Sequence, residues 1–212
     1  MWTPRTLLIT DTNLGDAAHA RVSAICADLT WISWSVNEPE ARAGVLDRIA
    51  TGSWDLAISC YSDLVLTQQA LDAVEFPLNI HPALPRLRGM GYDLIPLIEN
   101  HPTVGATLHR MARRVDSGEI FLVREEPVPA ARTYAGLRKF NQGLTLRMLD
   151  TLCGLMEEAG SLRHLSGGLR ERGARQPQRW GTVYHSRQSI AALRELYGEA
   201  GGEFGWGTRI RT

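Results

Sequence analysis

The stretch PLNIHPALPRLRGMG, residues 77–91, ends an apolar segment with two polar side chains and then breaks into a loop. Asn79 and His81 are two residues apart, so in a strand both side chains project from the same face. Pro82 disfavours a helix directly after His81. Because ligands of open parallel sheets bind beyond the carboxyl ends of the strands, this stretch predicts one wall of a cleft. On these residues alone, structural hydrogen bonding at a strand end is the alternative.

Upstream of this stretch, short apolar runs alternate with segments of helix length. We expect strands at residues 6–10, 31–36 and 54–60, and helices within 14–29 and 39–52. Strands separated by helices pair in parallel through right-handed crossovers. The pattern therefore predicts an α/β fold with a Rossmann-like, doubly wound, mostly parallel sheet.

Downstream, the pattern predicts two further strands within 104–111 and 118–128, and a long helix within 134–160 that Thr133 caps. Residues 161–181 are rich in Gly, Arg and Ser, which indicates a surface linker, and 186–201 read as a last helix. We therefore expect a catalytic domain over residues 1–160 and a C-terminal extension, linker plus helix, over residues 161–212.

Composition excludes several classes of function. The chain has 23 basic and 23 acidic residues, so no charge excess favours a nucleic-acid or membrane-surface partner. No apolar run approaches the ~18 residues of a membrane span, so we expect a cytoplasmic protein. Cys26, Cys60 and Cys153 lack the paired spacing of a metal or redox site, which predicts buried thiols and no metal.

A second polar group follows in VGATLHRMARRVDSGEI, residues 104–120, where Asp116 lies in a loop with Ser-Gly after it. If the strand before this loop lies beside the strand of Asn79, an Asn, a His and an Asp share one cleft. Such a set suits acyl transfer to an amine. Amide and imidazolium donors stabilise the negative charge on the carbonyl oxygen, and a carboxylate orients the imidazole and accepts a proton.

Together, NIHPALPRLRG and VGATLHRMARRVDSGEI resemble the signature of the folate-dependent formyltransferases, over about residues 54–128. The resemblance implies that 10-formyltetrahydrofolate donates a formyl group to a primary amine. Asn79 would hold the formyl oxygen, His81 would stabilise the oxyanion, and Asp116 would position His81 and manage the amine's proton. By position, His109 matches a family histidine, for which we expect a structural role.

The resemblance also implies two walls for the folate. DLVL, residues 63–66, matches the loop that cradles the pterin, and MARRV, residues 111–115, matches the opposite wall. We therefore expect cofactor contacts from six residues: Leu64, Val65, Leu66, Met111, Arg114 and Val115.

The acceptor amine is inferred from two comparisons within the family: the segments that this sequence shares with some formyltransferases, and the segments of other formyltransferases that it lacks. The chain ends too early for the C-terminal domain of methionyl-tRNA formyltransferases, and TDTNLGDAAH, residues 10–19, lacks the phosphate loop of purine-pathway members. The short loop after His81 and the segment 180–196 resemble sugar N-formyltransferases and the formylation domain of a peptide synthetase. We expect an amino deoxysugar linked to a nucleotide, with an amino acid, an aminoacyl carrier or another small amine as the alternative.

Two residues near the loop after His81 are candidate acceptor contacts. Arg88 would bind a phosphate or carboxylate and Tyr92 a ring face, against the alternative of a surface Arg and a buried Tyr. Hydrolysis of the same folate, and a folate-binding module without catalysis, are the competing functions. The last two helices make a homodimer a further expectation.

Overall fold

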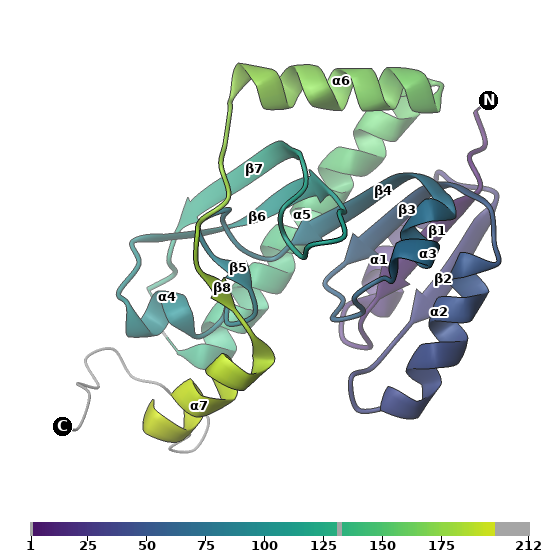
Figure 1. Ribbon diagram of the computed structural model, residues 1–212. Helices are drawn as coiled ribbons and strands as arrows, with labels where there is room; N and C mark the ends of the chain where they lie inside the picture. The colour runs from purple at the N-terminus through teal and green to yellow at the C-terminus, as the bar shows by residue number, and fades with distance from the viewer. Residues whose placement is uncertain (1, 131–132, 198–212) are drawn as a thin grey trace.

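The computed structural model describes residues 2–130 and 133–197, which form a central sheet with helices on both faces (Figure 1). The sheet contains β1 (Thr6–Thr10), β2 (Leu29–Ser33), β3 (Trp54–Cys60), β4 (Val74–His81), β6 (Thr103–Arg110) and β7 (Ile120–Pro127), in the order β2-β1-β3-β4-β6-β7. The first four strands pair in parallel, whereas β6 and β7 are antiparallel. This confirms the expected α/β class and its mostly parallel sheet.

Helices cover the two faces unequally. α1 (Gly15–Ser23) and α5 (Tyr134–Ala159) pack together on one face, while α2 (Arg42–Ala50), which the exposed turn η1 (Pro39–Ala41) precedes, and α3 (Gln68–Asp72) cover the other face near β1 and β3. Thr133 caps α5 as predicted, since its hydroxyl accepts a hydrogen bond from the Gly136 N–H. α4 (Ile95–Ile98) is a single turn. No helix in the described part of the chain is long and apolar enough to cross a membrane.

The alternation of side chains along β4 decides where the cleft lies. Leu78 and Ile80 are completely buried in the core on the α5 side, so Asn79 and His81 project from the opposite face. On that face α2 and α3 share one apolar cluster with β1 and β3, and neither helix packs extensively on β6. The polar residues that follow the parallel strands therefore border a hollow that no helix fills.

The linker predicted over 161–181 is wrong for most of its length. Residues Leu162–Arg175 form helix α6, which the Ser161 hydroxyl caps by accepting a hydrogen bond from the His164 N–H. Leu165 and Leu169 are buried in the same core as α5, and α6 packs on β7 (Figure 1). The arginines lie on the exposed side, and Gly173 lies against β7, where a Cβ would come within 2.5 Å of the Ile120 carbonyl oxygen. Composition alone therefore indicated a loop.

The rest of the extension crosses the sheet and returns to the cleft. Residues Tyr184–His185 (β8) pair in parallel with Arg88–Gly89 (β5), and α7 (Arg187–Tyr197) follows. The expected end of the last helix, residues 198–201, lies outside the described residues. Because β5 belongs to the loop after His81, the extension is attached directly to the wall of the cleft.

The packing of α6 predicts a stability defect that a linker would not show. Leu165→Ala removes a side chain that is only 2% exposed and should lower the free energy of unfolding by about 2–4 kcal/mol. Urea unfolding measures this loss. The matched control is Arg163→Ala, an exposed change in the same turn, which should cost less than about 0.5 kcal/mol. Equal stability of the two variants would contradict the packing of α6 described above.

Candidate active site

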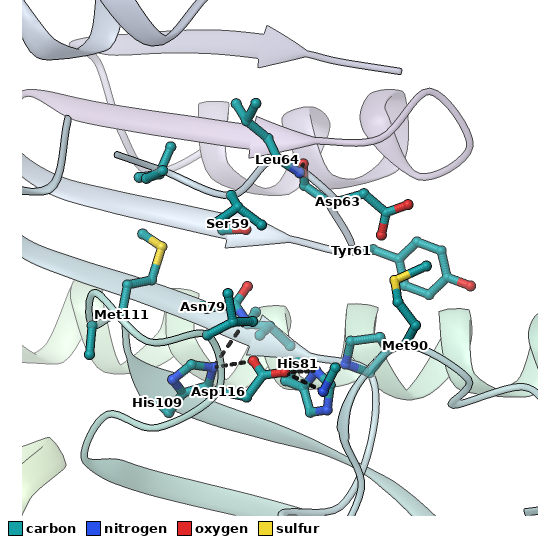
Figure 2. A pocket seen from close by; sticks show the side chains of 18 of the residues that line it. Ser59, Tyr61, Asp63, Leu64, Asn79, His81, Met90, His109, Met111 and Asp116 are labelled. Atoms are coloured by element: carbon teal, nitrogen blue, oxygen red, sulfur yellow. Dashed lines mark hydrogen bonds and ion pairs between the residues drawn. The ribbon is translucent and has the colours of Figure 1, made fainter. Parts of the chain in front are cut away.

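A cavity of about 240 Å³ opens at the carboxyl ends of β3 and β4 (Figure 2). Asn79, His81, His109 and Asp116 line one side of it. Asn79 and His109 are directly opposed in the antiparallel pairing of β4 with β6, which places their side chains next to each other. The prediction that the strand before Asp116 lies beside the strand of Asn79 is therefore confirmed.

The His81 ring is held by one strong hydrogen bond to the backbone. Its Nε2 lies 2.7 Å from the Leu87 carbonyl oxygen, which can only accept, so Nε2 carries a proton. Burial lowers the pKa of His81 below its ordinary 6.5, although Asp116 opposes this. The ring is consequently neutral at pH 7, and its Nδ1 has a free lone pair.

Asp116 presents a second acceptor beside that lone pair. Its Oδ2 accepts a hydrogen bond of 2.7 Å from the Gly89 N–H and lies 3.6 Å from His81 Nδ1. Burial raises the pKa of Asp116, but the two histidines and the Gly89 N–H outweigh this and lower it to about 2. Asp116 is therefore ionised, and the site presents two adjacent acceptors without a proton between them.

His109 fixes the orientation of the Asn79 amide. His109 Nδ1 lies 2.8 Å from the Arg110 carbonyl oxygen and so carries the proton, which leaves Nε2 as an acceptor. Asn79 Nδ2 donates to that Nε2 over 3.0 Å. One N–H of the amide is thereby occupied and the second remains available toward the cavity. A structural role is expected for His109, and its hydrogen bond orients the Asn79 amide.

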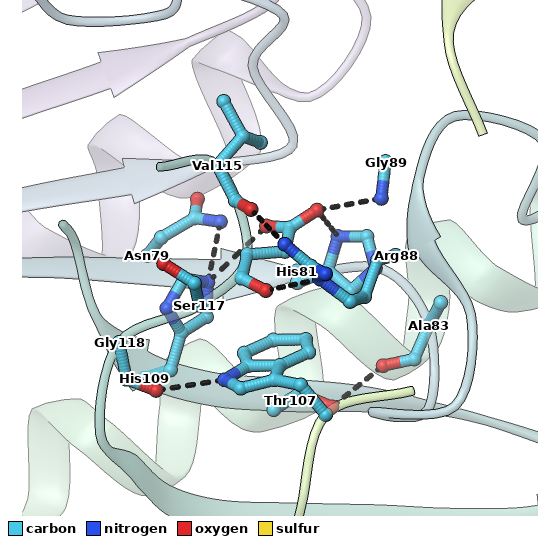
Figure 3. A network of polar contacts seen from close by, with 12 residues as sticks. Asn79, His81, Ala83, Arg88, Gly89, Thr107, His109, Val115, Ser117 and Gly118 are labelled. Carbon is cyan, nitrogen blue, oxygen red and sulfur yellow. Dashed lines mark hydrogen bonds and ion pairs between the residues drawn. The ribbon is translucent and has the colours of Figure 1, made fainter. Parts of the chain in front are cut away.

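Arg88 holds the loop that carries Asp116 through hydrogen bonds to its backbone (Figure 3). Arg88 Nε donates to the Asp116 carbonyl oxygen over 2.6 Å, and Arg88 Nη2 donates to that of Val115 over 2.9 Å. Asp116 has φ +47°, a region that Asp tolerates better than most residues. Gly118 follows in the same turn, and only glycine fits there because a Cβ would lie 1.9 Å from the Arg110 carbonyl oxygen.

Arg88 was predicted to bind the acceptor, and the structure places it elsewhere. Its side chain is 4% exposed, does not line the cavity and is used by the two carbonyl groups of the Asp116 loop. Arg114 is likewise not brought to the cavity, because its exposed side chain lies outside the lining. Both corrections have the same origin, since the tight turn at Asp116 draws Arg88 inward and leaves Arg114 on the outside.

The other predicted contacts do line the cavity. Leu64 and Leu66 are buried in the core under α3, whereas Val65 is 45% exposed, and the three face Met111 and Val115 across the cavity. Tyr92 also lines it, with its ring edge-on to His81 at 6.5 Å between centroids. The cavity thus joins an apolar slot to a polar end, as a ligand with a flat ring and a reactive polar group requires.

Two aromatic residues at the site are not among the predicted site residues. Trp180, in the extension, packs edge-on against His109 and His81 at 4.8 and 5.9 Å and donates from Nε1 to the Gly118 carbonyl oxygen over 2.7 Å. Tyr61 follows β3 with φ +54° and its hydroxyl donates to the buried Asp93. The strand-end rule that identified Asn79 points to Tyr61 as well, whereas no local signal connects Trp180 to a loop sixty residues away.

Comparison with known proteins shows the family. A sequence model of the family described as Formyl transferase matches residues 22–142, more than half of the chain, so the chain belongs to the formyltransferase family. No curated protein matches by sequence.

Solved structures share the fold at low sequence identity. An N-formyltransferase from Helicobacter canadensis, in complex with folinic acid and dTDP-3-aminofucose, has a TM-score of 0.63 and 15% identity over 88% of this chain and 72% of its own. A sugar N-formyltransferase from Shewanella sp. scores 0.57 at 18% identity, over 96% and 84%. A glycinamide ribonucleotide transformylase from Symbiobacterium toebii scores 0.57 at 19% identity, over 74% and 88%.

The electrostatics of the site predict how stability responds to acid. Asp116 has a lower pKa when folded than the ordinary 3.8, so its contribution is present above pH ~4 and is lost as the pH falls toward 2, by roughly 2 kcal/mol. The lowered pKa of His81 acts in the same sense below pH 6.5. In urea unfolding at pH 7 to 2, Asp116→Asn should lose less stability below pH 4 than the wild type.

The exposed Asp47→Asn provides the control, and its acid profile should match that of the wild type. An Asp116→Asn profile that is parallel to the wild type between pH 4 and 2 would mean that Asp116 is not stabilised as a carboxylate in the folded protein.

Proposed function

We propose that this protein transfers a formyl group from 10-formyltetrahydrofolate to a primary amine, the amino group of a nucleotide-linked deoxysugar. The observation that carries the proposal is the position of His81 Nδ1 beside Asp116 Oδ2, 3.6 Å apart, with the Nε2 of the same ring used by the Leu87 carbonyl oxygen. An ammonium group donates several hydrogens from one centre and suits two adjacent acceptors. The site is thus arranged to bind an amine and remove its proton.

The folate supplies the formyl group, and the lining of the cavity fits such a molecule. Leu64, Val65 and Leu66 offer an apolar wall of which Val65 is exposed toward a ligand, with Met111 opposite. A flat pterin would be held by this slot, and its formyl group would be held at the polar end. The ends of β3 and β4 border the cavity, and they set the separation between this apolar wall and the polar residues.

The side chains at the polar end have separate tasks. Asn79 Nδ2 directs its free N–H at the formyl oxygen, while the other N–H stays on His109. Neutral His81 accepts a proton at Nδ1 as the amine attacks the formyl carbon, and it becomes an imidazolium beside ionised Asp116 that stabilises the oxygen on which negative charge develops. When the bond between the formyl carbon and the folate nitrogen breaks, the same proton passes to that leaving nitrogen. Asp116 stabilises the imidazolium and keeps the amine oriented. Burial of this cluster strengthens each of these interactions because water is excluded.

Removal of the three polar groups tests the proposal. Asn79→Ala, His81→Ala and Asp116→Ala should each lower kcat/KM by ~100-fold or more, the scale expected for loss of an oxyanion donor or an acid–base group. The assay follows the gain of one formyl group by mass spectrometry, with a panel of nucleotide amino sugars, amino acids and small amines. The exposed Glu119→Gln, which is close in sequence but outside the cavity, serves as the control.

Wild-type turnover in any two of the three variants would exclude this mechanism. Release of formate at the same rate with and without an amine would instead indicate a hydrolase. Folate binding with no product across the whole panel would indicate a binding module.

His109 offers a finer test, because it is proposed to act through Asn79. His109→Leu removes the acceptor of the Asn79 amide and should lower kcat by about tenfold or more with little change in KM for the amine. His109→Gln provides an acceptor oxygen and should restore much of that loss. If Gln is as inactive as Leu while both variants fold, the role of His109 is proton transfer and not orientation of Asn79.

A further inference from the structure

A second cavity, of about 850 Å³, adjoins the first one and is bordered by α5, α7 and the segment 90–94. The two cavities share Asp63, Met90, Tyr92 and Arg187 in their linings, so they form one continuous space. The second cavity lies on the side of the catalytic residues away from the apolar slot of Leu64 and Leu66, which line only the first one. A molecule in it would therefore reach His81 from the side opposite the proposed folate slot.

Three arginines line this second cavity: Arg138 of α5, with Arg187 and Arg194 of α7. Within residues 2–130 and 133–197, the Arg138 guanidinium finds no hydrogen bond or ion pair, although the side chain is half-buried. Arg194 Nη2 donates to the Tyr134 hydroxyl over 2.6 Å and its guanidinium lies over the Tyr134 ring, so no carboxylate neutralises it. Two guanidinium groups that have no hydrogen-bonded carboxylate within the described residues consequently face the same space.

The acidic residues of the cavity leave both guanidinium groups without a hydrogen-bonded carboxylate. Asp63 is paired with Arg187 at 3.4 Å, and buried Asp93 is occupied by Asn141 and Tyr61. Burial raises the pKa of Asp93 to about 6, although Arg138 and Arg194 act in the opposite direction, so Asp93 offsets part of their charge at pH 7. Glu195 is exposed on α7. The donors of Arg138 and Arg194 therefore remain available to a ligand in the cavity.

We propose that this second cavity is the anion subsite of the acceptor, where Arg138 and Arg194, assisted by Arg187, bind the diphosphate of a nucleotide-linked amine. The inference rests on the proposed function and adds to it the residues that select the acceptor. Guanidinium groups bind phosphate oxygens in a bidentate manner, and two arginines on facing helices suit a diphosphate better than a single carboxylate. The continuous space leads from this subsite past Tyr92 to the acceptors of His81 and Asp116.

Binding of thymidine diphosphate, uridine diphosphate and inorganic pyrophosphate, measured by isothermal titration calorimetry without folate, tests the subsite separately from catalysis. At least one nucleoside diphosphate should bind, and Arg138→Met and Arg194→Glu should each raise its Kd by tenfold or more. Arg194 is exposed, so its variant should remain folded. The exposed Arg163→Met of α6 is the matched control and should stay within twofold of the wild type.

Two further arms separate the possible sources of the phosphate. Thymidine should bind far more weakly than thymidine diphosphate, and pantetheine 4′-phosphate, the prosthetic group of a carrier, should bind more weakly than the diphosphates. Tighter binding of pantetheine 4′-phosphate, or equal binding of thymidine, would overturn the diphosphate assignment. Wild-type affinity in both arginine variants, or no binding of any phosphate probe, would overturn the subsite.

The outcome is independent of whether formyl transfer occurs. His81→Ala should bind thymidine diphosphate as the wild type does, because His81 does not line the second cavity. An arginine-dependent affinity in a protein that formylates no amine would therefore leave the subsite standing and remove only the proposed reaction.

Discussion

The buried charge of Asp116 is the constraint on which the site depends. A carboxylate that is 5% exposed must be compensated, and here the Gly89 N–H donates a hydrogen bond to it, while the rings of His81 and His109 lie 3.6 and 3.5 Å away and compensate its charge when they are protonated. Each partner is fixed in turn by the backbone: His81 by the Leu87 carbonyl and His109 by the Arg110 carbonyl. Arg88 then holds the Asp116 loop through two carbonyl groups and not through the carboxylate. Arg88 therefore does not pair with the Asp116 carboxylate, which stays available to a ligand.

The C-terminal extension is part of this construction and not an appendage beside it. Trp180 packs on both histidine rings and binds the Gly118 carbonyl at the turn that follows Asp116. The β8 strand pairs with Arg88–Gly89, and Gly89, at φ +79°, could not carry a Cβ because the His185 carbonyl oxygen would lie 2.3 Å from it. The extension therefore supports the residue whose N–H binds Asp116, and it carries two of the three arginines of the second cavity.

Sequence patterns predicted the features that local chemistry determines. The strand at Thr6–Thr10, the cap at Thr133 and the approach of Asn79 to the strand before Asp116 follow from periodicity, capping and pairing rules. Helix α6 was missed because four glycines and serines in 161–168 resemble a loop until Leu165 and Leu169 are seen to share a buried face. The fate of Arg88 was unpredictable for a different reason: whether an arginine faces a ligand or a backbone carbonyl depends on a turn twenty-eight residues away.

The distribution of charge would allow a neutral chain to select the anionic acceptor proposed above. Formal charges sum to zero over the sequence, yet Arg138 and Arg194 line one cavity without a hydrogen-bonded carboxylate, and the carboxylate of Asp116 is buried in the next. A molecule that is negative at one end and carries an ammonium at the other would be oriented by this separation before any group reacts. Tyr92 and Met90 line both cavities, so the middle of such a molecule would lie beside them. Because the proposed proton acceptors lie at the far end of this path, the field that would bind the phosphates would also direct the amine to His81.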